Sequence, residues 1–191
     1  QLPIDSESRW RMVRALRNKQ AEPVSDEIKI RAAEERDMVQ VLEIYNYYVA
    51  NSVVTFDIEK MALADWHTKY AYIKGLELPF LVAESGSGQI LGFAYLAPWR
   101  QKAAYRRTVE DSIYLRPAAT GKRIGTKLLS ALIEKGKAAG VKEIVAVISD
   151  KGAESSIALH ESFGFTNQGH LGKVGFKFGR WLGTVLMQKS L

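Results

Sequence analysis

One segment combines glycines, basic residues and a helix start in an order that suits an anionic ligand. A predicted strand ends at residues 113–115, a glycine-containing loop covers residues 116–125, and a long helix follows. A helix N-terminus presents free N–H groups and partial positive charge, and glycine lets the backbone approach an anion closely. Residues 121–126 are therefore a candidate pyrophosphate cradle. Alternatively, Gly121 is a turn residue and Gly125 a helix-packing contact.

The elements that must position this loop alternate between helices and strands around one mixed sheet. Apolar side chains recurring at helical spacing predict helices from about Asp37, over 63–74, from Ile124 and over 154–163. Gly140 stands where the third helix is expected to end. Apolar runs predict strands at 28–32, 80–83, 90–96, 108–115, 144–148, 166–171 and 184–188, with a glycine-rich hairpin turn at 85–88.

Composition narrows the chemistry. The 191 residues are 47% hydrophobic and 25% charged, which is typical of a one-domain globular protein that is expected to be cytoplasmic. The longest apolar runs are too short to cross a membrane. The chain has no cysteine, so thiol nucleophiles and cysteine-ligated metals are excluded, and no metal site is expected. A net charge of +6 favours an anionic partner, and a phosphate-bearing cofactor suits it better than nucleic acid.

We expect residues 1–27 to form a surface extension, with Trp10, Val13 and Leu16 at helical spacing among arginines. Residues 28–191 then form the single domain. The extension lacks the apolar central region of a signal peptide, and its acidic residues argue against a transit peptide.

The loop and a downstream segment together resemble the GNAT acetyltransferase superfamily. The resemblance rests on Tyr114-Leu115-Arg116-Pro117, Thr120-Gly121-Lys122-Arg123-Ile124-Gly125 and Leu159-His160-Glu161-Ser162-Phe163-Gly164-Phe165. It implies an α/β (α+β) fold in which helices flank a mixed, mostly antiparallel twisted sheet. Splayed strands in that sheet hold acetyl-coenzyme A (acetyl-CoA). The loop departs from the usual pattern at Thr120 and at Arg123, where the superfamily has glycine.

A closer resemblance, over about residues 29–189, is to the phosphinothricin (methionine sulfoximine) acetyltransferase family. Its five segments are 44–49, 92–99 together with Tyr105, 108–110, 159–161 and 175–181. It implies acetyl transfer to the amino group of a small amino-acid-like substrate, of the kind that confers herbicide resistance, by a protein that is commonly a homodimer. The implied cofactor-binding residues are Ile113, Tyr114, Leu115, Gly121, Lys122, Arg123, Ile124, Gly125, Thr126 and Ser155.

The resemblance also assigns two catalytic roles. A protonated amine cannot attack a thioester, so a base is needed, and Glu110 stands at the family's catalytic glutamate position. From the residues alone, Glu110 is a solvated carboxylate or an ion-pair partner of Arg106 or Arg107. His160 would protonate the departing thiolate or act as a second base, whereas its alternative role is a packed histidine that caps its helix.

Substrate recognition is implied at Phe56, Trp99, Arg100, Lys102 and Tyr105, where cations would meet an anionic amino acid and aromatic rings would line its chain. Core packing is the alternative for Phe56 and Trp99. Three rival functions stay open: acetylation of a peptide N-terminus or aminoglycoside, a non-catalytic acyl-CoA sensor, and a basic nucleic-acid-binding module.

Overall fold

A computed structural model describes residues 27–191. The predicted N-terminal extension, residues 1–27, therefore lies outside the described residues except for its last position. The elements are β1 (Lys29–Ala32), η1 (Glu35–Asp37), α2 (Met38–Asn51), α3 (Leu63–Gly75), β2 (Phe80–Glu84), β3 (Ile90–Pro98), η2 (Ala103–Tyr105), β4 (Thr108–Leu115), η3 (Pro117–Ala119), α4 (Ile124–Ala138), β5 (Glu143–Ser149), α5 (Glu154–Ser162), β6 (Thr166–Lys177) and β7 (Arg180–Ser190).

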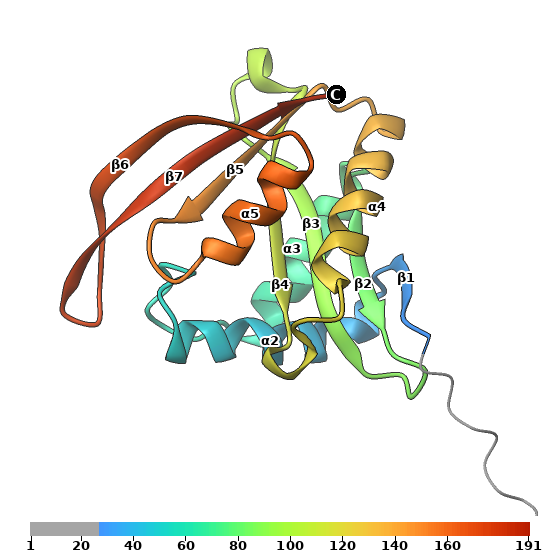
Figure 1. Ribbon diagram of the computed structural model, residues 1–191. Helices are drawn as coiled ribbons and strands as arrows, with labels where there is room; N and C mark the ends of the chain where they lie inside the picture. The colour runs from blue at the N-terminus through green and yellow to red at the C-terminus, as the bar shows by residue number, and fades with distance from the viewer. Residues whose placement is uncertain (1–26) are drawn as a thin grey trace, which may run out of the picture.

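One seven-stranded sheet forms the centre of the fold, in the order β1-β2-β3-β4-β5-β7-β6. All neighbours are antiparallel except β4 and β5, which are parallel and are joined by the crossover helix α4 (Figure 1). A parallel pair needs such a crossover, because a tight turn can join only antiparallel strands. The predicted mixed, mostly antiparallel sheet is confirmed.

Two apolar clusters lie on opposite faces of the sheet. One joins the sheet to α4 and contains Leu128, Leu129 and Leu132, all fully buried. The other joins it to α2 and α3 and is rich in aromatic rings, with Trp66 and Phe93 at 0% exposure. The strongly buried strands β2 and β3 separate the two clusters, since helices cover both of their faces.

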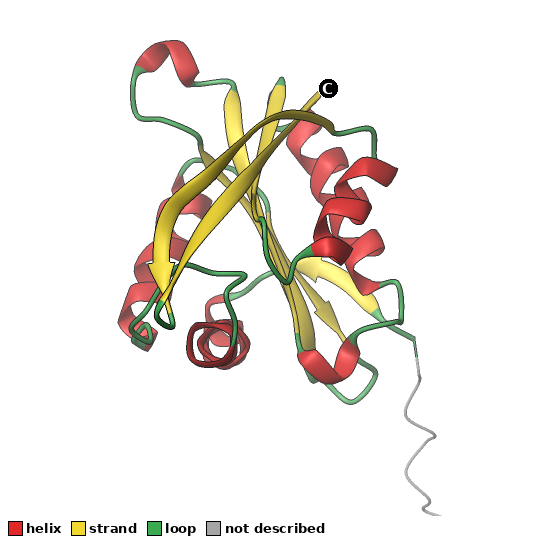
Figure 2. Cartoon of the chain, turned by 60° about the vertical axis from the view of Figure 1, so that its left-hand side comes forward, coloured by secondary structure: helices red, strands yellow, loops and turns green. Residues whose placement is uncertain are grey.

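The strands β4 and β5 separate partway along their length. Their register runs over three pairs, Thr108 with Glu143, Val109 with Ile144, and Glu110 with Val145. No further pair joins these two strands, both of which lie wholly within the described residues. From Asp111 onward β4 pairs with β3 alone, while β5 continues along β7. Figure 2 shows β5, β6 and β7 running at an angle to the other strands.

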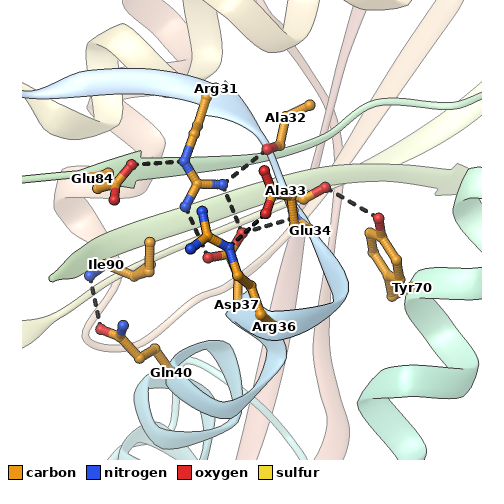
Figure 3. A network of polar contacts seen from close by, with 10 residues as sticks. All are labelled: Arg31, Ala32, Ala33, Glu34, Arg36, Asp37, Gln40, Tyr70, Glu84 and Ile90. Atoms are coloured by element: carbon orange, nitrogen blue, oxygen red, sulfur yellow. Dashed lines mark hydrogen bonds and ion pairs between the residues drawn. The ribbon is translucent and has the colours of Figure 1, made fainter. Parts of the chain in front are cut away.

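A polar network fixes the start of α2 to the sheet (Figure 3). Arg31 donates two hydrogen bonds to Asp37, at 2.7 and 2.9 Å, and a third to Glu84 at 2.7 Å. Asp37 also accepts from the backbone N–H of Glu34. Burial raises the pKa of Asp37, but the bonds from Arg31 and Glu34 outweigh it and hold that pKa below its usual value.

Gln40 continues this network toward the candidate loop. Its Oε1 accepts from the backbone N–H of Ile90 at 2.8 Å (Figure 3). It also accepts from Arg116 at 3.5 Å. Arg116 also donates to the Ile90 carbonyl and forms an ion pair with Glu43 at 2.6 Å. The entrance to the loop is thereby tied to α2.

The C-terminal hairpin is longer than the sequence predicted. Strands expected at 166–171 and 184–188 extend over Thr166–Lys177 and Arg180–Ser190. Glycines weaken the strand signal, but here the ladder continues past irregularities between Asn167 and Gly169 and between Leu171 and Gly175. The other predicted elements agree with the structure to within about two residues at most ends.

None of the helices within residues 27–191 is both long enough and apolar enough to cross a membrane.

Gly92 packs where β3 meets β4, next to the candidate loop. A Cβ there would lie 2.7 Å from Leu115 Cδ2 and 3.0 Å from the Tyr114 carbonyl oxygen. We therefore expect Gly92→Ala to lower the free energy of unfolding by about 1 to 3 kcal/mol, measured by urea denaturation. Gly75→Ala is the control, since nothing lies within 4 Å of that position. Equal stability of Gly92→Ala and the wild type would contradict this packing.

Candidate active site

A pocket of about 500 Å³ opens where β4 and β5 separate. Its walls are the unpaired part of β4, the end of β5, the start of α4 and one side of α5. The residues that line it are Tyr48, Val54, Glu110, Asp111, Ser112, Ile113, Tyr114, Leu115, Thr120, Gly121, Arg123, Ile124, Gly125, Thr126, Val147, Ile148, Ser149, Gly152, Ala153, Ser155, Ser156, Leu159 and His160.

The pocket brings together most of the predicted cofactor residues. Nine of them line it, while Lys122 is exposed and outside the lining. Because no strand within residues 27–191 pairs with β4 on this side beyond Glu110, its backbone groups there are available to an extended ligand. Within the described residues no group of His, Asp or Glu side chains could hold a metal ion.

The N-terminus of α4 forms one end of the pocket. The N–H groups of its first turn have no partner within the helix, and residue 123 makes no side-chain cap. The first turn contains no acidic residue that would neutralise its partial positive charge. This end of the pocket therefore suits an anion such as a pyrophosphate.

The two glycines of this loop have different surroundings. Gly121 has φ +84°, and nothing lies within 4 Å of the point where a Cβ would stand, so its role is conformational. Gly125 lies against Leu159 of α5, 3.3 Å from where its Cβ would stand, so it is a helix-packing contact as well as a pocket residue. Arg123 adopts φ +57°, a left-handed conformation that glycine adopts most readily.

Glu110 is the last residue of β4 that pairs with β5, and it lines the pocket. Among residues 27–191 its carboxylate has neither a hydrogen bond nor an ion pair, so the expected alternative partners, Arg106 and Arg107, do not bind it. Burial raises the pKa of Glu110, and the nearby Asp111 charge raises it further, while Arg100 and Lys69 lower it. A carboxyl with a raised pKa and no partner is suited to accept a proton.

His160 lies on the opposite face of β4 from Glu110. Its Nε2 is 2.7 Å from Asp111 Oδ2, and its Nδ1 is 2.7 Å from the Ser156 carbonyl oxygen. A carbonyl only accepts, so Nδ1 carries a proton, and an ionised Asp111 requires a second proton on Nε2. Burial lowers the pKa of His160, but the bond and charge of Asp111 outweigh it, and the pKa ends above its usual value.

The predicted substrate residues lie outside this pocket lining. Trp99, Arg100, Lys102 and Tyr105 belong to the segment between β3 and β4, where the Arg100 guanidinium stacks 4.2 Å from the Trp99 ring centre. Phe56 packs instead against Gly175 of the C-terminal hairpin. None of the three aromatic residues belongs to either apolar core, although Phe56 and Trp99 are half-buried.

Sequence reasoning missed Asp111 and Tyr48. Tyr48 of α2 donates a hydrogen bond from its hydroxyl to the Leu115 carbonyl oxygen and lines the pocket. Its contact spans 67 residues, and the Asp111 to His160 contact spans 49. No local pattern could reveal either contact, because the partners lie in distant segments of the chain.

A family model described as the acetyltransferase (GNAT) domain matches residues 30–186. The chain therefore belongs to the GNAT acetyltransferases, and it is an acetyl-transferring enzyme. The separation of β4 from β5, with a pocket at that point, is the candidate site for this activity.

Within this family the chain is similar to enzymes named for small amino-acid substrates. It is 38% identical to an L-methionine sulfoximine/L-methionine sulfone acetyltransferase of Pseudomonas paraeruginosa, over 85% of this chain and 94% of the relative. A phosphinothricin acetyltransferase from Sinorhizobium meliloti, solved in complex with acetyl-CoA, is 42% identical with a TM-score of 0.82, covering 86% of this chain and 88% of the relative.

A third similar protein has a different named substrate. The crystal structure of a ribosomal-protein-alanine N-acetyltransferase from Brucella melitensis is 39% identical, with a TM-score of 0.82 over 85% of this chain and 99% of that one. Overall similarity therefore does not by itself select the acceptor.

The buried pair of Asp111 and His160, with side chains 4% and 3% exposed, makes a prediction about stability. The pKa of folded His160 is raised, so the pair stabilises the fold below about pH 6.5 and loses that contribution as the pH rises through the raised pKa. We expect Asp111→Ala to cost about 3 to 5 kcal/mol at pH 6 and less at alkaline pH, measured by urea denaturation.

The exposed pair of His170 and Asp150, 2.8 Å apart, supplies the control. His170 is 53% exposed, so His170→Ala is expected to leave stability nearly unchanged. A loss for Asp111→Ala that is the same at every pH would show that the pair is not charged.

Proposed function

We propose that the chain transfers the acetyl group of acetyl-CoA to the amino group of a small amino-acid-like substrate such as phosphinothricin or methionine sulfoximine. The observation that carries this proposal is the half-buried Glu110 carboxylate at the point where β4 and β5 separate, which has no hydrogen bond or ion pair within residues 27–191. The names of the relatives support the substrate class.

The pocket fits the cosubstrate by its chemistry. Backbone N–H groups of residues 124–126, with the Arg123 charge, would hold the pyrophosphate, and the unpaired edge of residues 111–115 would bind the pantetheine arm. Bound acetyl-CoA would supply the activated acetyl thioester. The chain has no cysteine, and we propose direct transfer with no covalent acyl-enzyme.

Glu110 acts as the base in this proposal. It takes a proton from the substrate ammonium, through a water molecule, and leaves a neutral amine that can attack the acetyl carbon. A backbone N–H of β4 stabilises negative charge on the acetyl oxygen. His160 lines the same pocket, and a protonated imidazole there favours departure of the thiolate.

The basic segment that leads into β4 favours an anionic amino acid, because its Arg100 lowers the pKa of Glu110. Four basic residues lie between the end of β3 and the start of β4, namely Arg100, Lys102, Arg106 and Arg107. Within residues 27–191 none of them has an ion pair. Cations without an ion pair on this segment would bind an anionic group of the substrate. The same charge disfavours an aminoglycoside, which would need an acidic pocket.

Loss of the base is the test of the chemistry. We expect Glu110→Gln to lower kcat/KM by about 10²- to 10⁴-fold, because the amide cannot accept the proton. In the wild type, kcat/KM should rise with pH through a carboxyl pKa above the ordinary 4.5, and this acid limb should disappear in Glu110→Gln.

Thiol release from acetyl-CoA is the measurement, against phosphinothricin, methionine sulfoximine, glutamate, methionine, an aminoglycoside and a peptide. Turnover of the peptide alone would favour the N-terminal acetyltransferase rival. Cofactor binding without turnover of any amine would favour the sensor, and the absence of cofactor binding would contradict the proposed site.

We also propose that the enzyme is a homodimer that pairs through its C-terminal hairpin. Leu171, Val174, Phe176, Phe178 and Trp181 are each at least half exposed there, which is a large apolar surface to leave in water. The Phe176 and Trp181 rings lie 5.5 Å apart across the hairpin.

If this surface joins two copies, Trp181→Glu should convert a dimer of the wild type into a monomer in analytical ultracentrifugation. The exposed Tyr72 of α3 offers a control, since Tyr72→Glu should leave the dimer intact. A wild-type monomer would contradict the pairing.

A further inference from the structure

Lys69 of α3 forms no ion pair with any described acidic side chain. Its Nζ lies 3.3 Å from the Tyr95 hydroxyl, 5.1 Å from the Trp66 ring centre and 5.4 Å from the Tyr95 ring centre. Within residues 27–191 it has no ion pair. The aromatic faces thus hold the ammonium in one place while leaving its charge available.

This ammonium lies on the same face of the sheet as Glu110. Tyr95 pairs with Ser112, and Ala97 pairs with Glu110, so the Tyr95 and Glu110 side chains are diagonal neighbours on one face. The Lys69 charge also acts on Glu110 directly, since it lowers the pKa of that carboxyl together with Arg100. Two cations from separate elements, α3 and the segment after β3, therefore lower the pKa of the base.

An amino-acid substrate that places its amine beside Glu110 also places a second carboxylate near that residue. Its carboxylate is attached to the carbon that bears the amine, so an amine placed beside Glu110 brings the carboxylate close to the same carboxyl group. Repulsion between the two carboxylates must then be offset by a nearby cation. The loop cations Arg100 and Lys102 are exposed, whereas Lys69 is half-buried and held by two rings.

We propose that Lys69 is a specificity-determining residue that binds the α-carboxylate of the amino-acid substrate while Glu110 takes the proton from its amine. The inference rests on the proposed function. It assigns the basic segment between β3 and β4 to the distal part of the substrate, and it explains how the enzyme distinguishes an amino acid from a simple amine.

The test compares methionine sulfoximine with its decarboxylated amine, which keeps the side chain and lacks the carboxylate. Lys69→Met retains the apolar stem against Trp66, so the fold is preserved. We expect it to lower kcat/KM for methionine sulfoximine about 10- to 100-fold, mainly through KM, and to change kcat/KM for the decarboxylated amine by less than about 3-fold. Lys69→Arg should restore much of the lost activity.

Two further readouts separate binding from a structural role. The acid limb of the pH profile for the decarboxylated amine should move to higher pH in Lys69→Met, because a charge that lowers the pKa of Glu110 is gone. Lys74→Met is the matched control, since Lys74 lies on the same helix with its Nζ 5.6 Å from the Tyr70 ring centre. It should leave both substrates and the pH profile unchanged.

The outcomes distinguish this inference from the proposed function. An active wild type in which Lys69→Met affects both substrates equally, or neither, overturns the role of Lys69 and leaves the proposed function standing. A wild type that binds acetyl-CoA but acetylates neither compound overturns the proposed function, and the role of Lys69 falls with it.

Discussion

The separation of β4 from β5 is the constraint on which the proposed active site depends. The two strands are parallel neighbours through Glu110 and Val145 and then diverge, so the edge of β4 is left without a strand partner. Backbone N–H and C=O groups in a protein interior require partners, which makes an unpaired central edge a binding surface for an extended ligand. The crossover helix α4 begins at the same place, and its N-terminus completes the pocket.

Alternation along β4 then divides the chemistry between two faces of the sheet. Glu110 and Tyr114 face the aromatic cluster below α2 and α3, whereas Asp111 faces α5 and bonds to His160. This chain thus presents a carboxyl with a raised pKa on one face of β4 and the hydrogen-bonded pair of Asp111 and His160 on the other. Contacts far from the chemistry support this arrangement, since Arg116 and Gln40 fix the loop to α2, and Tyr48 bonds to the end of β4.

Local sequence patterns were sufficient for most of the fold. The regular apolar spacing of α4 and the alternating segments predicted the mixed sheet, because such patterns report the period of an element directly. The long C-terminal hairpin was underestimated, since its glycines weaken the strand signal that cross-strand pairing restores. Nine of the ten cofactor-binding residues that the resemblance implied line one pocket. Asp111, Tyr48 and Lys69 were not predicted, because their contacts join distant segments of the chain. The roles assigned to Glu110 and His160 came from the resemblance, and they stay predictions.

The most direct test of the central claim is a crystal structure of the enzyme with coenzyme A and methionine sulfoximine bound together. We expect the pyrophosphate on the backbone N–H groups of residues 124–126 and the pantetheine arm along residues 111–115. We also expect the substrate amine within hydrogen-bond reach of Glu110, directly or through one water molecule. Coenzyme A bound away from the separation of β4 and β5, or an amine on the His160 face with Glu110 out of reach, would contradict the proposed site.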